Sequence, residues 1–161
     1  MDRVYQEKVS SRRTEVLFVA LMVLFLLLFA WRIRAAGADG LSMLFLGCLV
    51  FFLFYAINYR TLELQITGES LTLKYGLFTW TVSLDNIEDC YQDEVPLARI
   101  GGAGIHFTSI RKRYRVMFNF LEYPRLVLSL KRKIGPVRDV VFSTRHPAEI
   151  ERFIKEAIVG R

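Results

Sequence analysis

Two kinds of hydrophobic pattern divide the chain near residue 59. Before it, two apolar runs without a charged residue occupy Val16–Trp31 and Leu41–Ile57. Once its flanks are counted, each run reaches the roughly 17–25 residues that cross a bilayer. Neither run shows the polar stripe that a helix on the surface of a soluble domain carries. We therefore predict a transmembrane hairpin with spans over about residues 16–33 and 41–58.

The connector between the two runs, Arg32–Gly40, is short and contains glycines that suit a tight turn. A short connector puts both ends of the hairpin on the same side of the membrane. The flanks carry more cations than the connector, so the positive-inside rule places both termini in the cytoplasm. A cleaved signal peptide is the disfavoured alternative, because a second apolar run follows at once. We expect three parts, integral to the cytoplasmic (inner) membrane: a cytoplasmic N-terminal segment (1–14), the hairpin (15–59) and a cytoplasmic domain (60–161).

From Thr61 onward, apolar and polar residues alternate over short segments separated by turn residues. This pattern is typical of antiparallel strands that bury one face and leave the other in water. It predicts seven strands, at residues 61–67, 70–76, 77–83, 87–92, 113–120, 125–131 and 138–144.

The last predicted element is a helix from His146 to Ile158. Pro147 suits its first turn, and the apolar residues that follow repeat with the spacing of a single stripe. Such a helix is suited to close one open end of a bent sheet. The expected fold class is therefore a membrane hairpin followed by an α+β domain, in which an antiparallel barrel or sandwich of about seven strands is closed by a C-terminal amphipathic helix.

Three segments carry a resemblance to a known family: GGAGIHF (101–107), the strand pair at 125–144, and STRHPAEIERFI (143–154). With the order of elements, they make residues 62–158 similar to the bacterial PH-like (pleckstrin-homology-like) domain membrane proteins. The resemblance implies a binding or scaffolding domain and no reaction. The first hairpin loop, where phosphoinositide-binding PH domains hold cations, contains Glu69 and no cation here, so inositide binding is not implied.

The net charge of +6 suggests an anionic neighbour. The cations gather in two clusters, at Arg111, Lys112, Arg113 and at Lys131, Arg132, Lys133. Because almost no linker separates the second span from the first strand, alternating turns would place both clusters near the membrane. The leading interpretation is that they seat the domain on anionic headgroups. Solvated edges that deter aggregation, or a face for an acidic protein partner, are the alternatives. Nucleic acid is less favoured, because the aromatic residues are needed in the core.

The acidic residues gather elsewhere, at Asp85, Glu88, Asp89, Asp93 and Glu94. They lack the spacing of an EF-hand and suggest a solvated face that could dock a basic partner. Gly101, Gly102 and Gly104 precede a strand and no helix, so they indicate a loop or bulge, not a nucleotide site.

His106 and His146 stand alone, and Cys48 and Cys90 fit neither a disulfide nor a zinc site. No catalytic residue, cofactor or metal is predicted. We expect a non-catalytic, membrane-anchored module that binds or scaffolds. The alternative is an accessory or structural subunit of a larger membrane complex, with the hairpin packed against other spans.

Overall fold

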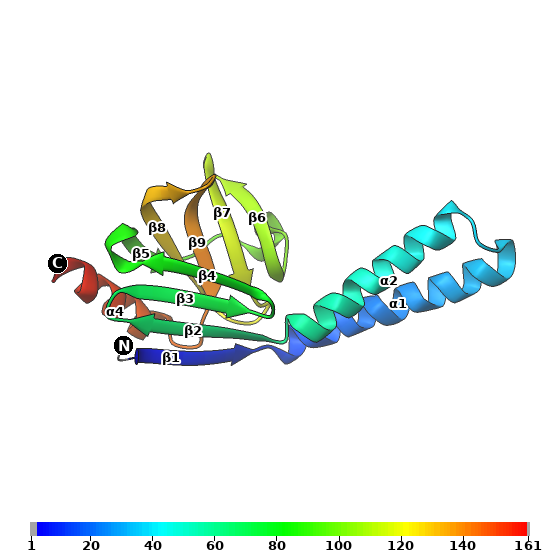
Figure 1. Cartoon of the computed structure of the whole chain (residues 1–161), viewed down its shortest axis with the longest axis horizontal. Coiled ribbons are helices and arrows are strands. Elements are labelled where there is room, and N and C mark those ends of the chain that lie inside the picture. Colours follow the sequence, from blue (N-terminus) through cyan, green and yellow to red (C-terminus); the bar gives the residue numbers. More distant parts are fainter. Residues whose placement is uncertain (1–2, 161) are drawn as a thin grey trace.

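The computed structural model describes residues 3–160 of the chain, and Figure 1 shows a helical hairpin projecting from a two-layered β domain. The described residues form β1 (Arg3–Ser10), α1 (Arg12–Ala36), α2 (Gly40–Asn58), β2 (Thr61–Thr67), β3 (Ser70–Tyr75), β4 (Phe78–Ser83), a 3-10 turn (Leu84–Asn86), β5 (Ile87–Gln92), α3 (Leu97–Ile100), β6 (Gly104–Ile110), β7 (Arg113–Asn119), β8 (Arg125–Ile134), β9 (Val137–Ser143) and α4 (Pro147–Val159).

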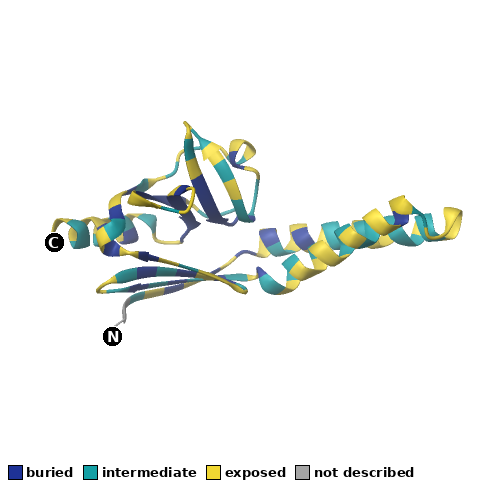
Figure 2. Ribbon diagram, turned by 45° about the horizontal axis from the view of Figure 1, so that its top comes forward, coloured by how far each residue is buried: buried dark blue, intermediate teal, exposed yellow. Residues whose placement is uncertain are grey.

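The hairpin consists of α1 and α2, which are long and apolar enough to cross a membrane. With 25 and 19 residues, they extend about 37 and 28 Å, compared with about 30 Å for the hydrocarbon core of a bilayer. Figure 2 shows their surfaces mostly exposed or half-exposed along their length. The two predicted spans correspond to these helices.

We expected the N-terminal segment to be separate from the domain. It instead forms the first strand of the domain. β1 pairs with β2 in antiparallel register, with Glu7 opposite Leu64. Glu7 occupies an inward position and is buried, where it accepts hydrogen bonds from the Thr144 hydroxyl (2.6 Å) and the Arg145 backbone N–H (2.8 Å). A charged residue at an inward position interrupts the alternation of apolar and polar residues. For this reason the sequence pattern did not predict β1.

The strands make two sheets, with orders β1-β2-β3-β4 and β5-β8-β9-β7-β6. The sheets are separate in their hydrogen bonding and do not close into a barrel. The second sheet is mixed, because β7 runs parallel to β9. This differs from the all-antiparallel arrangement of seven strands that was predicted, since both β1 and β6 are additional strands.

The main core lies between the two sheets and is closed at one end by α4. Ile150 and Ile154 of this helix are fully buried against it. The predicted C-terminal helix is thus confirmed, and Figure 1 shows it at the end of the domain away from the hairpin.

The hairpin and the domain are joined rigidly at two points. A single residue, Ser11, separates β1 from α1 and caps the first turn of the helix with its side chain, and two residues separate α2 from β2. The Thr14 hydroxyl of α1 accepts a hydrogen bond from the Leu121 N–H at 3.2 Å. On α2, the Tyr55 hydroxyl donates to the Ile105 carbonyl at 3.5 Å. Such short connections and direct contacts leave the domain little freedom to turn relative to the hairpin.

Candidate functional site

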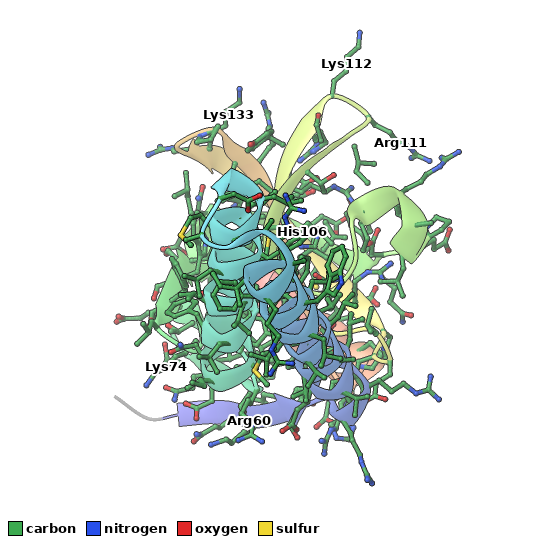
Figure 3. All side chains as sticks on the ribbon, turned by 90° about the vertical axis from the view of Figure 1, so that its right-hand side faces the viewer. Arg60, Lys74, His106, Arg111, Lys112 and Lys133 are labelled. Carbon is green, nitrogen blue, oxygen red and sulfur yellow. The ribbon has the colours of Figure 1, made fainter. Side chains whose placement is uncertain are left out.

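The two basic clusters lie at one end of the strands of the second sheet. Because β7 and β9 are parallel and Arg115 pairs with Asp139, the β6–β7 and β8–β9 turns fall at the same end. Six cations there are exposed, and we call them the basic edge: Arg111, Lys112, Lys131, Arg132, Lys133 and Arg138. Figure 3, which looks along the hairpin, shows the labelled members pointing outward at one rim of the molecule, with Arg60 and Lys74 at the opposite side.

The β6–β7 turn has an unusual backbone. Ile110 pairs with Arg113, so the turn contains only two residues, Arg111 and Lys112. Both have positive φ, 52° and 63°. Two-residue hairpins of this geometry favour Asn-Gly, since left-handed backbone costs an ordinary residue about 1–2 kcal/mol. The sequence therefore holds two cations where other residues would be less strained.

The second half of the basic edge is held by Asn86. Its side-chain amide donates to the Arg132 carbonyl at 3.0 Å and accepts from the Arg132 N–H at 2.8 Å. These two bonds extend the pairing of β8 past Ile87 and fix the backbone that carries three cations, while their charged ends remain in solvent.

Arg113 differs from its neighbours in the cluster. Its guanidinium pairs with Asp139, at 2.7 Å from Nη2 to Oδ1, and also donates to the Ser129 hydroxyl at 3.2 Å. The hydrogen bond to Asp139 raises the pKa of Arg113 above its usual range. This arginine is half-buried and engaged, so it contributes less to the basic edge than the sequence suggested.

A buried ion network continues from Arg113 across the outer face of the sheet. Arg115 contacts Asp139 (3.0 Å) and Asp93 (3.4 Å), and Arg125 contacts Asp93 (3.0 Å). The Asp93 side chain is only 2% exposed. It therefore does not belong to a solvated acidic face, whereas Asp85, Glu88, Asp89 and Glu94 are exposed as expected.

A pocket of about 940 Å³ opens beside this network, between residues 91–96, α3 and the end of β6. Arg99, Arg111 and Arg115 line it together with Asp93, Glu94 and Glu151. The two signs of charge balance in number, so the pocket itself favours neither an anion nor a cation.

The strand directions near the hairpin differ from those that a simple alternation of turns predicts. β6 begins at the hairpin, where an added Cβ on Gly104 would lie 3.2 Å from the Tyr55 ring, and runs away from it. β7 returns, so the turn at Arg111 lies at the end of this strand pair that is away from the hairpin. β6, which the count of seven strands omitted, accounts for the reversal, and the simple alternation of turns is wrong.

The position of the basic edge follows from the lean of the hairpin. Figure 1 shows α1 and α2 rising obliquely toward the side of the first sheet on which the second sheet stands, and Figure 3 shows the same lean end-on. The hairpin axis is therefore tilted toward the basic edge and away from α4.

The remaining candidates have structural surroundings. His106 is half-buried, and its ring nitrogen bonds the Ile100 carbonyl at the end of α3. Burial lowers the pKa of His106, against a smaller opposite effect of this bond. His146 is exposed at the start of α4, without a capping bond from its side chain. Burial raises the pKa of the Cys90 thiol to about 12. In the described part of the chain, no group of three or more His, Cys, Asp or Glu residues is placed to hold a metal.

Sequence reasoning missed the ion network, because Asp93 and Asp139 are 46 positions apart and neither forms a motif with the arginines. It also missed the strained turn, since Arg-Lys is not a hairpin signature. Comparison with protein-family models gave no match, and comparison with curated protein sequences gave none either.

Proposed function

We propose that the protein is a non-catalytic, PH-like binding and scaffold module anchored in the cytoplasmic membrane. In this proposal α1 and α2 span the bilayer, both termini and the domain lie in the cytoplasm, and the basic edge binds anionic headgroups of the inner leaflet. The rigid junction means that the domain stays at the membrane surface in one orientation.

The observation that carries the proposal is the strained β6–β7 turn. Arg111 and Lys112 keep a left-handed backbone that Asn and Gly would adopt at lower cost. Strain retained at an exposed site motivates a hypothesis of function, since nothing in the packing of the turn requires these side chains. Two fixed cations beside four more on the next turn form a concentrated positive surface.

The lean of the hairpin supports the same conclusion. If the hairpin axis stands close to the membrane normal, the tilt brings the basic edge toward the bilayer and turns α4 away from it. Cations near an anionic leaflet each contribute about 1 kcal/mol, and this contribution fades within about 8–10 Å at physiological salt. A rigid, leaning domain is suited to keep its cations within that range.

The test uses the full chain in lipid nanodiscs, with Cys48→Ala and a fluorophore on Pro136→Cys in the β8–β9 turn. Cys90 will not compete for the label, because its raised pKa keeps the buried thiol protonated. We expect stronger quenching by spin-labelled anionic headgroups than by spin-labelled zwitterionic ones. This preference should weaken with salt and fall about fivefold for each cation of the basic edge changed to Gln.

A matched pair of double variants provides the control. Arg111→Gln/Lys112→Gln removes two cations from the basic edge, and Arg152→Gln/Lys155→Gln removes two exposed ones from α4. Only the first should reduce the anionic preference. Equal effects, or no preference in the unaltered protein, would contradict lipid binding and favour an acidic protein partner for these cations.

A second variant of the turn tests strain and charge by two different measurements. Arg111→Asn/Lys112→Gly should raise the free energy of unfolding by about 1–3 kcal/mol, because it relieves two left-handed residues. The same change should lower the anionic preference. A variant that is less stable would show that the turn is not strained, and one that retains full preference would show that its cations do not act.

The orientation is tested with a C-terminal reporter that is active only in the periplasm. We expect no activity when it is fused after Arg161, and activity when it is inserted in the connector at Gly37. The reverse result would overturn the cytoplasmic placement and, with it, the choice of inner-leaflet lipid.

A further inference from the structure

We propose that an apolar surface of the domain enters the interfacial layer of the membrane beside the hairpin and contacts the glycerol and upper acyl-chain region. This apolar collar consists of Leu77, Phe78, Phe107 and Tyr114. The inference rests on the proposed function, because both require the hairpin to be in the bilayer. It adds a contact that depends on hydrophobic burial and not on charge.

The distribution of exposed apolar residues is the first observation. Between residues 5 and 160, large hydrophobic side chains of the β domain and α4 are exposed only at the four collar positions and at Val159, near the end of α4. The other exposed ones all lie on α1 and α2. Scattered apolar residues on a surface need no explanation, but the four collar positions lie on the two parts of the domain that approach the hairpin, the β3–β4 turn and the β6–β7 strand pair.

The β3–β4 turn forms the first part of the collar. Gly76 lies so close to the end of α2 that an added Cβ would clash with the Asn58 carbonyl oxygen. The next residue, Leu77, is 73% exposed, and Phe78 is 53% exposed while its ring stacks on Tyr59 (6.1 Å, 21°). The turn is therefore fixed at the level where α2 ends, with its apolar side chains uncovered.

β6 forms the second part. Its first residues contact the hairpin through Gly104 and Ile105, which both approach Tyr55. Phe107 follows Ile105 on the same face of the strand, is 52% exposed and stacks on Tyr114 (5.9 Å, 18°). The exposed aromatic pair thus continues from the hairpin along β6 toward the basic edge.

The chemistry around the collar identifies lipid as the partner. At one end it is continuous with the apolar hairpin, and at the other end Tyr114 lies on β7 just after the turn that holds the cations Arg111 and Lys112. Apolar and aromatic groups rimmed by cations are typical of surfaces that lie in the headgroup and upper acyl-chain region. A protein partner on the collar would instead have to fit around a hairpin that itself lies in lipid.

The experiment places a fluorophore at Leu77→Cys in the full chain with Cys48→Ala, reconstituted in nanodiscs. Quenching by lipids spin-labelled near the top of the acyl chain is compared with quenching by aqueous iodide. Glu69→Cys, in the β2–β3 turn, and Leu27→Cys, in the middle of α1, serve as references for water and for the bilayer core. We expect the label at position 77 to be quenched by shallow lipid labels and protected from iodide.

This result should be the same in neutral and anionic lipid and unaffected by salt, which distinguishes it from binding by the basic edge. Quenching of the label at 77 by iodide alone, as at 69, would overturn the collar while lipid quenching at 27 shows that the hairpin is inserted. Protection from both quenchers would also overturn it, and would indicate a protein contact. Absence of lipid quenching at 27 would contradict the proposed function and the collar together.

Discussion

The two faces of the second sheet are buried to a similar degree but by different means. The inner face presents Val116, Phe118, Leu128 and their neighbours to the main core, and its side chains are apolar. The outer face carries Arg115 on β7 and Asp139 on β9. Each is followed along its strand by an apolar residue of the inner face, and the outer face is covered by residues 93–103. Alternate residues of one strand therefore enter two interiors, one apolar and one in which the ion pairs lie beside apolar residues such as Met117 and Val141.

The difference lies in what each face requires of its surroundings. Apolar burial is non-directional and contributes roughly 25 cal/mol for each Å² removed from water. Buried charges lose their hydration, and this cost is offset only when every group has a well-placed partner. The outer face meets that demand with a connected network, in which Ser129 and Tyr91 supply further hydrogen bonds to the charged residues. Three changes test the contrast between the two faces.

Asp139→Asn should be the most damaging. It leaves the buried guanidinium of Arg115 with one carboxylate partner fewer, and breaking a buried pair typically costs about 3–5 kcal/mol. Thermal unfolding of the full chain in detergent micelles measures the loss. The double variant Asp139→Leu/Arg115→Met should recover part of it, because both charges are removed together. A single variant as stable as the unaltered chain would show that the network is not required.

Leu128→Ala tests the inner face of the neighbouring strand. A fully buried leucine truncated in a packed core costs about 2–5 kcal/mol, through lost transfer free energy and the cavity left behind. The loss should not depend on salt or pH, whereas that of Asp139→Asn involves charge. Equal salt dependence of the two variants would remove the distinction between the faces.

Acid should lower the free energy of unfolding through His106, which bonds the Ile100 carbonyl in the segment that covers the outer face. Burial lowers the pKa of His106 below the ordinary 6.5, so the unfolded chain binds a proton at a higher pH than the folded chain does. The free energy of unfolding therefore decreases as the pH falls below about 6.5 and levels off below the folded pKa. Unfolding midpoints at about pH 7.5 and 5.5 should differ more for the unaltered chain than for His106→Gln. An equal difference would assign the effect to other groups.

The contrast also explains which parts of the fold followed from the sequence. Alternation predicted the inner face, because Val116 and Phe118 are apolar and regularly spaced. The same pattern indicated that Arg115 faced water. It does not, since its partners come from Asp93 and Asp139, and no local signal connects residues so far apart. For the same reason β1, with Glu7 pointing inward, had no recognisable pattern.

The candidate site was predictable in composition but not in placement. The two runs of cations are visible in the sequence, and their shared edge follows from two hairpin turns. Their position relative to the hairpin depended on β6, which begins with a glycine-rich segment that looked like a loop. The left-handed backbone at Arg111 had no signal at all, since it reflects the pairing of Ile110 with Arg113.

The pairing of β1 with β2 has a consequence for biosynthesis. These adjacent strands flank the hairpin, so with α1 and α2 in the bilayer, as proposed, the first sheet assembles only after both strands have emerged on the same side. A chain that inserted one helix and not the other would separate β1 from its partner by the width of the membrane. In that arrangement β1 and β2 can pair only after correct insertion, and a misinserted chain would expose an unpaired strand edge, which is a template for aggregation.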